Sequence, residues 1–304
     1  MGSLFGGRLS LNGHDVVLYD IFQAHVDRIN TDGLEIEESA TGEILKAFPL
    51  ASSDPLDVKD SDLMVVFVKS TATEAVAKQF VPMAGEHTVV LTLQNGLGNE
   101  DILRKHFGEH RTAAGVTSQG ATFLGPGKIR HAGSGPTHIC MSDKKNEKLS
   151  AVVAALKDSG FEVDIEENIA DLVWSKLIIN VGINAVTAIS GLENGKLLDY
   201  PEMKSLMADL VEEAVKVAEK KGVKLSYSNP IELVYEVSEK TAENRSSMLQ
   251  DFDRGSFTEI DFINNAIVRE GAKLGIDTPY NRQISELVKT MEQVNRERKA
   301  ADAQ

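Results

Sequence analysis

Residues 63–68 read Leu-Met-Val-Val-Phe-Val, and residues 89–93 read Val-Val-Leu-Thr-Leu. Both runs are short and almost entirely apolar, which is typical of strands that are buried on both faces of a parallel sheet. Residues 15–19, Asp-Val-Val-Leu-Tyr, form a third candidate strand, and helical segments separate the three. Because strands that alternate with helices indicate a parallel sheet covered by crossover helices, the first half of the chain is predicted to be an α/β domain.

Polar residues follow each of these three strands. They are Asp20, Lys69 and Asn95. Open α/β sheets bind ligands outside the carboxyl ends of their strands, so we expect these side chains to share one functional rim. The turn Gly125-Pro126-Gly127 is expected to join two further strands.

The beginning of the chain indicates a dinucleotide site. Residues 1–9 are predicted to form a helix, and Gly2 then corresponds to the third glycine of a Rossmann-type turn, where a small residue allows close packing and the helix N-terminus holds pyrophosphate. Asp20 at the end of the next strand can accept hydrogen bonds from ribose hydroxyls. The alternatives are an ordinary small residue for Gly2 and a helix cap or solvated strand end for Asp20.

The second half of the chain has a different pattern of apolar and polar residues. After about Glu166 the pattern is that of long helices, as in 203–220, where apolar residues recur at helical spacing. A chain of 304 residues is long enough for two domains. We therefore predict a Rossmann-type dinucleotide-binding domain at 1–165 and an all-helical substrate and catalytic domain at 166–304, with a solvated helix end after Glu292.

Composition excludes several classes of protein. The net charge of −14 opposes binding to nucleic acid, and no run approaches the roughly 18 apolar residues that a membrane span requires. A single cysteine, Cys140, can form neither an internal disulfide nor a zinc site, and no signal-peptide pattern precedes the first strand. We expect a cytoplasmic protein without a metal.

The segment 174–186 is the most informative one. It is predicted to be a helix that is apolar nearly all round, yet Lys176, Asn180 and Asn184 recur at four-residue spacing and so lie along one stripe. Burying such groups without partners costs roughly 1–3 kcal/mol for an amide and more for a charge. The stripe is therefore expected to face a ligand, water or partners, and a satisfied polar seam between domains is the alternative.

A second cluster of polar residues occupies 244–261. It contains Asn244 and Ser247, then Glu259 within Thr-Glu-Ile-Asp, which is predicted to open an amphipathic helix. An acidic residue in a first turn also complements the helix dipole, so capping is the alternative role for Glu259.

Three motifs together resemble the ketopantoate reductase (2-dehydropantoate 2-reductase) family, namely Lys-(x)3-Asn-(x)3-Asn at 176–184, Ser-Ser-Met-Leu-Gln-Asp at 246–251 and Thr-Glu-Ile-Asp at 258–261. The resemblance covers essentially the whole chain. It implies NAD(P)H-dependent reduction of a 2-oxo acid to a D-2-hydroxy acid, with 2-dehydropantoate to pantoate, a step of pantothenate biosynthesis, as the expected reaction. It also implies a cleft between a Rossmann domain and a helical domain as the active site.

The resemblance assigns a role to each candidate residue. Lys176 resembles the general acid that protonates the nascent alkoxide, and Glu259 resembles the carboxylate that orients the substrate and pairs with this lysine. Asn95 resembles the residue between nicotinamide and substrate. The substrate-binding residues that the resemblance implies are Asn95, Asn180, Asn184, Asn244 and Ser247. The expected cofactor-binding residues are Gly2, Asp20, Lys69, Asn95 and Glu259.

Two features depart from the family's pattern. The family begins with a strand and two glycines that are absent from this numbering, which indicates either an incorrectly assigned start codon or a sheet without its first strand and therefore weak dinucleotide binding. Members that use NADPH carry a basic residue where this chain has Asp20-Ile21-Phe22, so NADH is the expected preference. The alternatives are an NAD-dependent D-2-hydroxyacid dehydrogenase of the same superfamily and a non-catalytic dinucleotide-sensing protein. A small-molecule 2-oxo acid is the expected partner, and a homodimer is a candidate assembly.

Overall fold

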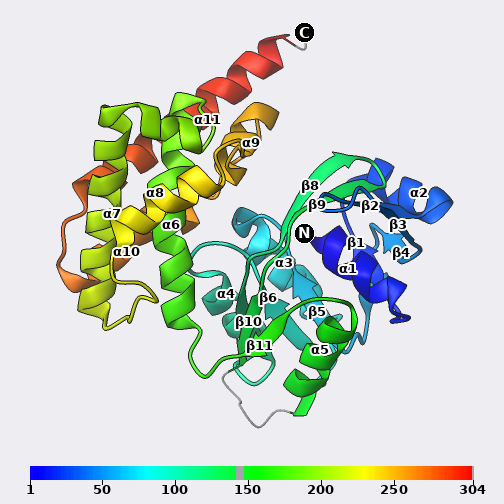
Figure 1. The fold of residues 1–304 in the computed structure, drawn as a ribbon. Coiled ribbons are helices and arrows are strands. Elements are labelled where there is room, and N and C mark those ends of the chain that lie inside the picture. The colour runs from blue at the N-terminus through cyan, green and yellow to red at the C-terminus, as the bar shows by residue number, and fades with distance from the viewer. Residues whose placement is uncertain (142–146, 303–304) are drawn as a thin grey trace. The chain divides into compact units, whose positions relative to one another are not determined.

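The computed structural model describes residues 1–141 and 147–302, and the chain divides into two compact units (Figure 1). Unit 1 comprises Met1–Gln94 and Asn99–Ile169. Unit 2 comprises Asn95–Gly98 together with the chain from Ala170 onward. The short segment Asn95–Gly98 thus belongs with unit 2, although it follows a strand of unit 1.

Unit 1 is an α/β unit whose described strands form three sheets. The largest has the strand order β11-β10-β7-β6-β5, in which β5, β6 and β7 are parallel. Its strands are β5 (Leu63–Val66), β6 (Val89–Thr92), β7 (Thr112–Thr117), β10 (Thr137–Met141) and β11 (Val163–Ile165). A two-stranded parallel sheet consists of β1 (Val17–Tyr19) and β4 (Leu50–Ser52). The third sheet has the order β3-β2-β9-β8 and consists of β2 (Leu34–Glu38), β3 (Ile44–Ala47), β8 (Gly120–Gly125) and β9 (Lys128–Gly133).

Helices cover both faces of the strands in unit 1. Side chains of α1 (Gly2–Leu11) and α5 (Glu147–Asp158) pack with Val89 and Leu91 on one face, whereas α3 (Thr73–Phe80) and α4 (Asn99–Phe107) pack with Val90 on the other. The remaining helix, α2 (Gln23–Asp32), follows β1. Successive residues of one strand therefore enter different cores, as in a doubly wound sheet. The predicted α/β class, the initial helix and the turn between β8 and β9 are confirmed.

The strands β1 and β5 belong to separate sheets, although they contribute to the same two cores. Leu18 and Val65 pack on one core, and Val17 and Met64 pack on the other. All four residues of β6 are buried, whereas the residues of β1 and most of β5 are half-buried. The prediction that 63–68 is a central strand buried on both sides is therefore wrong for β5, because among the described strands it pairs with β6 alone.

Close packing of α1 on the strands occurs at glycines other than the expected one. A Cβ atom on Gly7 would lie 2.8 Å from Ile36 Cδ1, and one on Gly6 would collide with Leu18. A Cβ atom on Gly2 would lie 3.9 Å from Phe67 Cβ, which is an ordinary contact. The packing role expected for Gly2 therefore belongs to Gly6 and Gly7, one turn or more into the helix.

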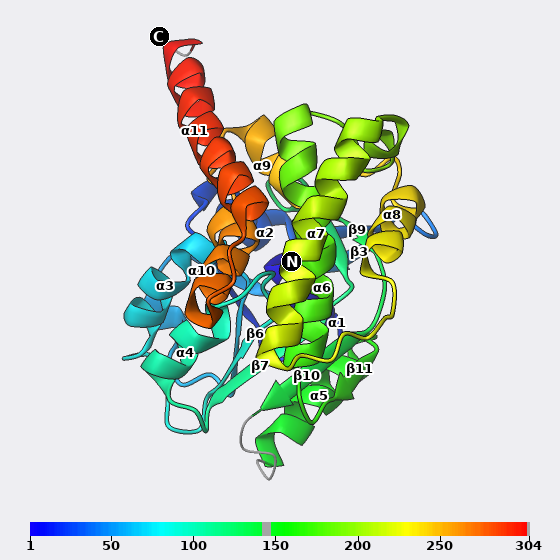
Figure 2. The same cartoon turned by 90° about the vertical axis from the view of Figure 1, so that its left-hand side faces the viewer.

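Unit 2 is helical and is organised around α6 (Ala170–Ser190), which Figures 1 and 2 show in the middle of the unit. Helices α7, α8, α9 and α11 pack directly against it. The surrounding helices are α7 (Pro201–Lys221), α8 (Pro230–Lys240), α9 (Ser247–Arg254), α10 (Asn264–Leu274) and α11 (Pro279–Asp302), with short 3-10 turns η3 (Gly195–Asp199) and η4 (Ile260–Phe262). The helical class predicted for the second half is confirmed.

Helix α6 is long and apolar enough to cross a membrane by length and composition alone. Within the structure, however, 67 % of its apolar window is buried. Burial of this extent is what the central helix of a packed bundle requires, so we interpret α6 as a core helix.

Candidate active site

Lys176 is a half-buried residue of α6 within a run of buried apolar residues. The adjacent residues Trp174, Leu177 and Ile178 are each at most 2 % exposed. Desolvation lowers the pKa of the Lys176 ammonium to about 8, and the negative charge of Glu259 opposes this change by raising the pKa. Such an ammonium is still mainly protonated at neutral pH but releases its proton more readily than an ordinary lysine. That property suits a general acid.

Glu259 is buried, with 8 % of its surface exposed, on the segment that precedes η4. Its side chain makes no capping hydrogen bond to this turn, and only its backbone oxygen accepts the N–H groups of Phe262 and Ile263. The structure therefore does not support capping as the role of the carboxylate. The predicted amphipathic helix beginning at 258–261 is also wrong, because a 3-10 turn comes first and α10 begins only at Asn264.

The loop Asn95–Gly98 is held against the turn that Glu259 introduces. The backbone N–H of Leu97 donates to the carbonyl oxygen of Phe262 at 2.9 Å. Gly96 has a φ of +87°, and a Cβ atom there would lie 2.8 Å from Phe262 Cβ, so both the conformation and the space require glycine. This contact places Asn95, a half-buried residue, in the same unit as Lys176 and Glu259.

The other predicted substrate residues lie on α6 and around the start of α9. Asn180 is half-buried and Asn184 is buried, with 6 % exposed. Asn244 and Ser247 are exposed, and the carbonyl oxygen of Asn244 accepts the N–H of Asn194 at 3.0 Å. Ser247 is the first residue of α9, whose N-terminal cap is the hydroxyl of the preceding serine.

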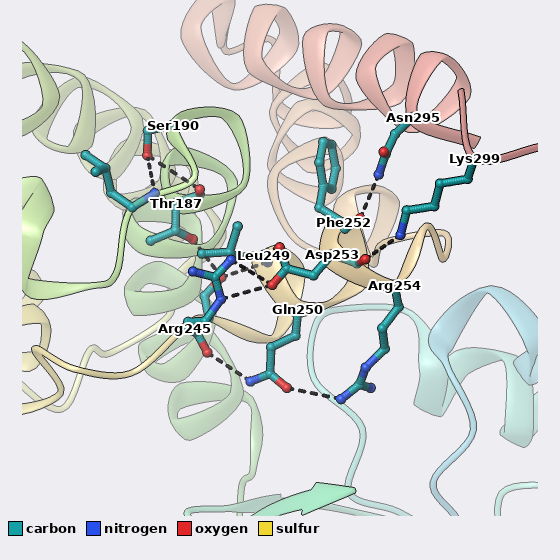
Figure 3. A network of polar contacts seen from close by, with 12 residues as sticks. Thr187, Ser190, Arg245, Leu249, Gln250, Phe252, Asp253, Arg254, Asn295 and Lys299 are labelled. Carbon is teal, nitrogen blue, oxygen red and sulfur yellow. Dashed lines mark hydrogen bonds and ion pairs between the residues drawn. The ribbon is translucent and has the colours of Figure 1, made fainter. Parts of the chain in front are cut away.

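Helix α11 supports these segments through residues that the sequence did not indicate. Glu292 is buried and accepts the backbone N–H of Thr258 at 2.8 Å, next to Glu259. Asn295 donates to the carbonyl oxygen of Phe252 at 2.6 Å, and Lys299 donates to that of Asp253 (Figure 3). The predicted solvated helix end after Glu292 is confirmed, since residues 293–301 are exposed except the half-buried Asn295, although Asn295 and Lys299 also contact α9. Spacings of three and four residues place these side chains on one helical face, which is the signal that could have revealed them.

Unit 1 holds three of the predicted cofactor residues, Gly2, Asp20 and Lys69, near the start of α1. Burial lowers the pKa of the Met1 amino group to about 6, while Asp20 raises it and Lys69 lowers it, so both charged side chains lie near the helix N-terminus. Asp20 also accepts the N–H of Phe22 at 2.9 Å through one carboxylate oxygen. A carboxylate, a cation and a helix N-terminus at one place fit the ribose and phosphate groups of a dinucleotide.

A hydrogen-bond network in unit 1 connects residues that are close to Lys69 and Asn95 in the sequence. Gln94 donates to the carbonyl oxygen of Val68 at 2.6 Å and to the hydroxyl of Thr73 at 2.9 Å. Thr73 in turn donates to Asn99 at 2.9 Å, and Asn99 donates to Ser70 at 3.0 Å. These bonds join the carboxyl ends of β5 and β6, so they fix the backbone from which the two candidate residues project.

Within residues 1–141 and 147–302, no group of three or more His, Cys, Asp or Glu side chains could hold a metal ion. The charged groups of unit 2 that are candidates for catalysis are the ammonium of Lys176 and the carboxylate of Glu259. This pair can stabilise and protonate an oxyanion.

Comparison with known families gives two consecutive matches. Residues 1–144 match the family described as ketopantoate reductase PanE/ApbA, and residues 168–292 match its C-terminal domain. A 2-dehydropantoate 2-reductase from Halobacterium salinarum is 36 % identical over 291 residues, which are 95 % of each chain. One from Streptococcus pyogenes is 32 % identical over 297 residues, covering 97 % of this chain and 95 % of the relative.

Solved structures agree with these matches. A PanE/ApbA family ketopantoate reductase from Ralstonia eutropha has a TM-score of 0.88 at 34 % identity and covers 96 % of this chain and 95 % of its own. A D-mandelate dehydrogenase in a ternary structure with NADH and anilino(oxo)acetate has a TM-score of 0.89 at 29 % identity, with coverage of 97 % and 96 %. Both neighbours thus extend over nearly the full chain.

Proposed function

Because the chain belongs to the ketopantoate reductase family, we propose that it reduces 2-dehydropantoate to pantoate with a nicotinamide dinucleotide as cofactor. Relatives that cover at least 95 % of the chain are named for this reaction. The observation that carries the proposal is the desolvated ammonium of Lys176, with a pKa near 8 and the charge of Glu259 acting on it.

The proposed mechanism assigns proton transfer to Lys176. When bound, the reduced nicotinamide supplies a hydride to the carbonyl carbon of the 2-oxo acid. Negative charge then develops on the carbonyl oxygen, and the Nζ ammonium of Lys176 stabilises this charge and donates a proton to it. Glu259 keeps the lysine protonated before the reaction, whereas burial favours the neutral amine that remains afterwards.

The remaining assignments follow the family's motifs. We propose residues 1–165 as the dinucleotide-binding domain and 166–304 as the substrate and catalytic domain. The substrate-binding residues that we propose are Asn95, Asn180, Asn184, Asn244 and Ser247. The cofactor-binding residues that we propose are Gly2, Asp20, Lys69, Asn95 and Glu259. A cytoplasmic location, a homodimeric assembly and the absence of nucleic-acid and membrane partners stay predictions.

Asp20 supports a preference for NADH over NADPH. Its carboxylate can accept hydrogen bonds from ribose hydroxyls, whereas a 2′-phosphate would place a second anion beside it. Two like charges about 4 Å apart repel by about 4 kcal/mol at an effective dielectric constant near 20. Arg28 and Lys69 are the cations that could relieve this repulsion by reaching the phosphate, and the guanidinium of Arg28 now pairs with Asp32 at 2.5 Å in an exposed ion pair.

The test of cofactor choice compares NADH and NADPH in binding and in kcat/KM. We expect wild-type protein to prefer NADH by about tenfold or more, which is roughly 1.4 kcal/mol. Asp20→Asn should reduce this preference, and Ile21→Arg should reduce it further, since Ile21 is 85 % exposed and tolerates a longer side chain. A native preference for NADPH, or one for NADH that both variants retain, would remove Asp20 from the specificity determinants.

A second candidate function is interconversion of another 2-oxo acid and its D-2-hydroxy acid. It is favoured by the structural neighbour that is named a D-mandelate dehydrogenase and was solved with NADH. The deciding experiment measures nicotinamide oxidation with 2-dehydropantoate and a panel of aromatic and aliphatic 2-oxo acids. The highest kcat/KM for 2-dehydropantoate supports the reductase, and an aromatic 2-oxo acid as the best substrate supports the second candidate. Cofactor binding without any turnover would instead favour a sensing protein.

A further inference from the structure

A chain of three hydrogen bonds joins the beginning of α9 to α6 inside unit 2. The N–H of Leu249 donates to Ser246 Oγ at 3.1 Å, and Ser246 Oγ lies 2.6 Å from Thr187 Oγ1. Thr187 Oγ1 donates to the carbonyl oxygen of Asn184 at 2.8 Å. Ser246, Thr187 and Asn184 are all buried. Figure 3 shows Thr187 on α6 beside Leu249 of α9.

The direction of each bond in this chain is determined by its two ends. The amide of Leu249 can only donate and the carbonyl of Asn184 can only accept. Thr187 therefore uses its single proton on Asn184, and the proton between the two hydroxyls must come from Ser246. Each hydroxyl donates once and accepts once, so both are satisfied without water. A buried and fully satisfied chain of this kind restricts the connected segments to one arrangement.

The chain connects two segments that carry proposed substrate residues. One end is the carbonyl group of Asn184, and Ser246, whose hydroxyl belongs to the chain on the other segment, directly precedes Ser247. Arg245 and Asp253 hold the outer side of α9 by an ion pair at 2.7 Å, and Gln250 donates to the carbonyl oxygen of Arg245 at 3.0 Å (Figure 3). The ion pair is exposed and so contributes little, whereas the hydroxyl chain is buried. The hydroxyl chain, together with the packing of buried Met248 in the core around α6, thus holds Ser247 in place relative to Asn184.

We infer that Thr187 and Ser246 are positioning residues for the 2-oxo acid: their hydroxyl pair holds the start of α9 at the distance from α6 that the substrate requires. This inference rests on the proposed function and names residues that touch no substrate. Displacement of a binding group by about 1 Å is enough to weaken substrate binding strongly. Loss of the pair should therefore raise KM for the 2-oxo acid, while the Kd of the cofactor stays unchanged because none of the proposed cofactor-binding residues lies on α9 or bonds to Thr187 or Ser246.

The experiment measures KM, kcat and the Kd of the preferred cofactor in Thr187→Val and Ser246→Ala. Valine keeps the shape of threonine and leaves the cap of α9 in place, so it is the variant expected to fold normally. We expect KM to rise by about tenfold in each, because Ser247 would no longer be held where it meets the substrate. The conservative variants Thr187→Ser and Ser246→Thr keep the hydroxyls and should retain a KM near the wild-type value.

The matched control is Ser238→Ala. Ser238 is a fully buried serine of α8 whose hydroxyl donates only to Val234 of its own helix at 2.9 Å. Its loss should lower stability without changing KM. A wild-type KM in Thr187→Val, or an equal rise in Ser238→Ala, would overturn the inference while leaving the reductase proposal intact. If wild-type protein reduces no 2-oxo acid at all, the proposed function fails and the inference fails with it.

Discussion

The polar stripe of α6 has two ends that differ in their physics. At the Lys176 end, burial lowers the pKa of an ammonium to about 8, and a carboxylate acts on it through its charge. At the Asn184 end, the groups are neutral, and the hydroxyls of Thr187 and Ser246 each donate one hydrogen bond and accept one. The Lys176 end carries a charge that can change during a reaction, whereas hydrogen bonds at the Asn184 end keep the backbone in one arrangement. Regular spacing on one helix can therefore supply both.

The largest expected effect is that of Lys176→Ala on turnover. Loss of a general acid typically lowers the rate by about 10²–10⁴-fold, so kcat should fall by that factor. The Kd of the cofactor should stay near the wild-type value, because the lysine is proposed to act on the substrate oxygen. Steady-state kinetics and a binding titration check both quantities. If the variant turned over at the wild-type rate, the two ends of the stripe would not differ in role.

The pH profile of kcat/KM should depend on Glu259. Activity that requires the protonated lysine falls as the pH rises through about 8, the pKa of the Lys176 ammonium. Since Glu259 raises this pKa, Glu259→Gln should move the alkaline limb to lower pH and lower the rate at pH 8. The control is Glu292→Gln, which keeps an acceptor for Thr258 and should leave the limb in place. Equal profiles for wild type and Glu259→Gln would remove the carboxylate from the chemistry.

The same lysine should make folding stability depend on pH. Its pKa is about 8 in the folded protein, whereas an unperturbed lysine side chain has a pKa of 10.5, so between these values the unfolded chain binds more protons. The free energy of unfolding should therefore rise from pH 8 to 10.5, by about 1–3 kcal/mol after allowance for partial exposure. Urea unfolding of Lys176→Met should lack this contribution to the rise. If the free energy of unfolding of Lys176→Met rose with pH as steeply as that of the wild type, the lysine would not be desolvated in the folded protein.

The smallest expected effect is the coupling at the neutral end. In a double-mutant cycle of Thr187→Val and Ser246→Ala, the two losses of stability should differ from additivity by about 0.5–3 kcal/mol, because the residues share one hydrogen bond. This coupling should be the same at pH 6 and pH 9, since neither hydroxyl titrates there. Additive losses would mean that the 2.6 Å contact contributes nothing, and a pH-dependent coupling would erase the contrast between the two ends.

Much of the fold was predictable because its signals are local. Strands β1, β5 and β6 were predicted within two residues at each end, as was the initial helix, since apolar runs and helical spacing are properties of consecutive residues. The exposure of β5 was not predictable, because it depends on which strand lies beside it. The short turn at Ile260–Phe262 was also missed, since its interruption of the helix depends on contacts with Leu97 and Glu292.

The candidate site divides in the same way. The sequence by itself determined that Lys176, Asn180 and Asn184 share one face, because the α-helix repeats every 3.6 residues. It also indicated Glu259 and Asn95 through the family's motifs. Only the tertiary structure decided that burial lowers the pKa of Lys176, that Asn95 groups with unit 2, and that Thr187 bonds to Ser246, 59 positions later in the chain. Desolvation and hydrogen-bond partners are properties of neighbours in space, and residues far apart in sequence become neighbours only when the chain folds.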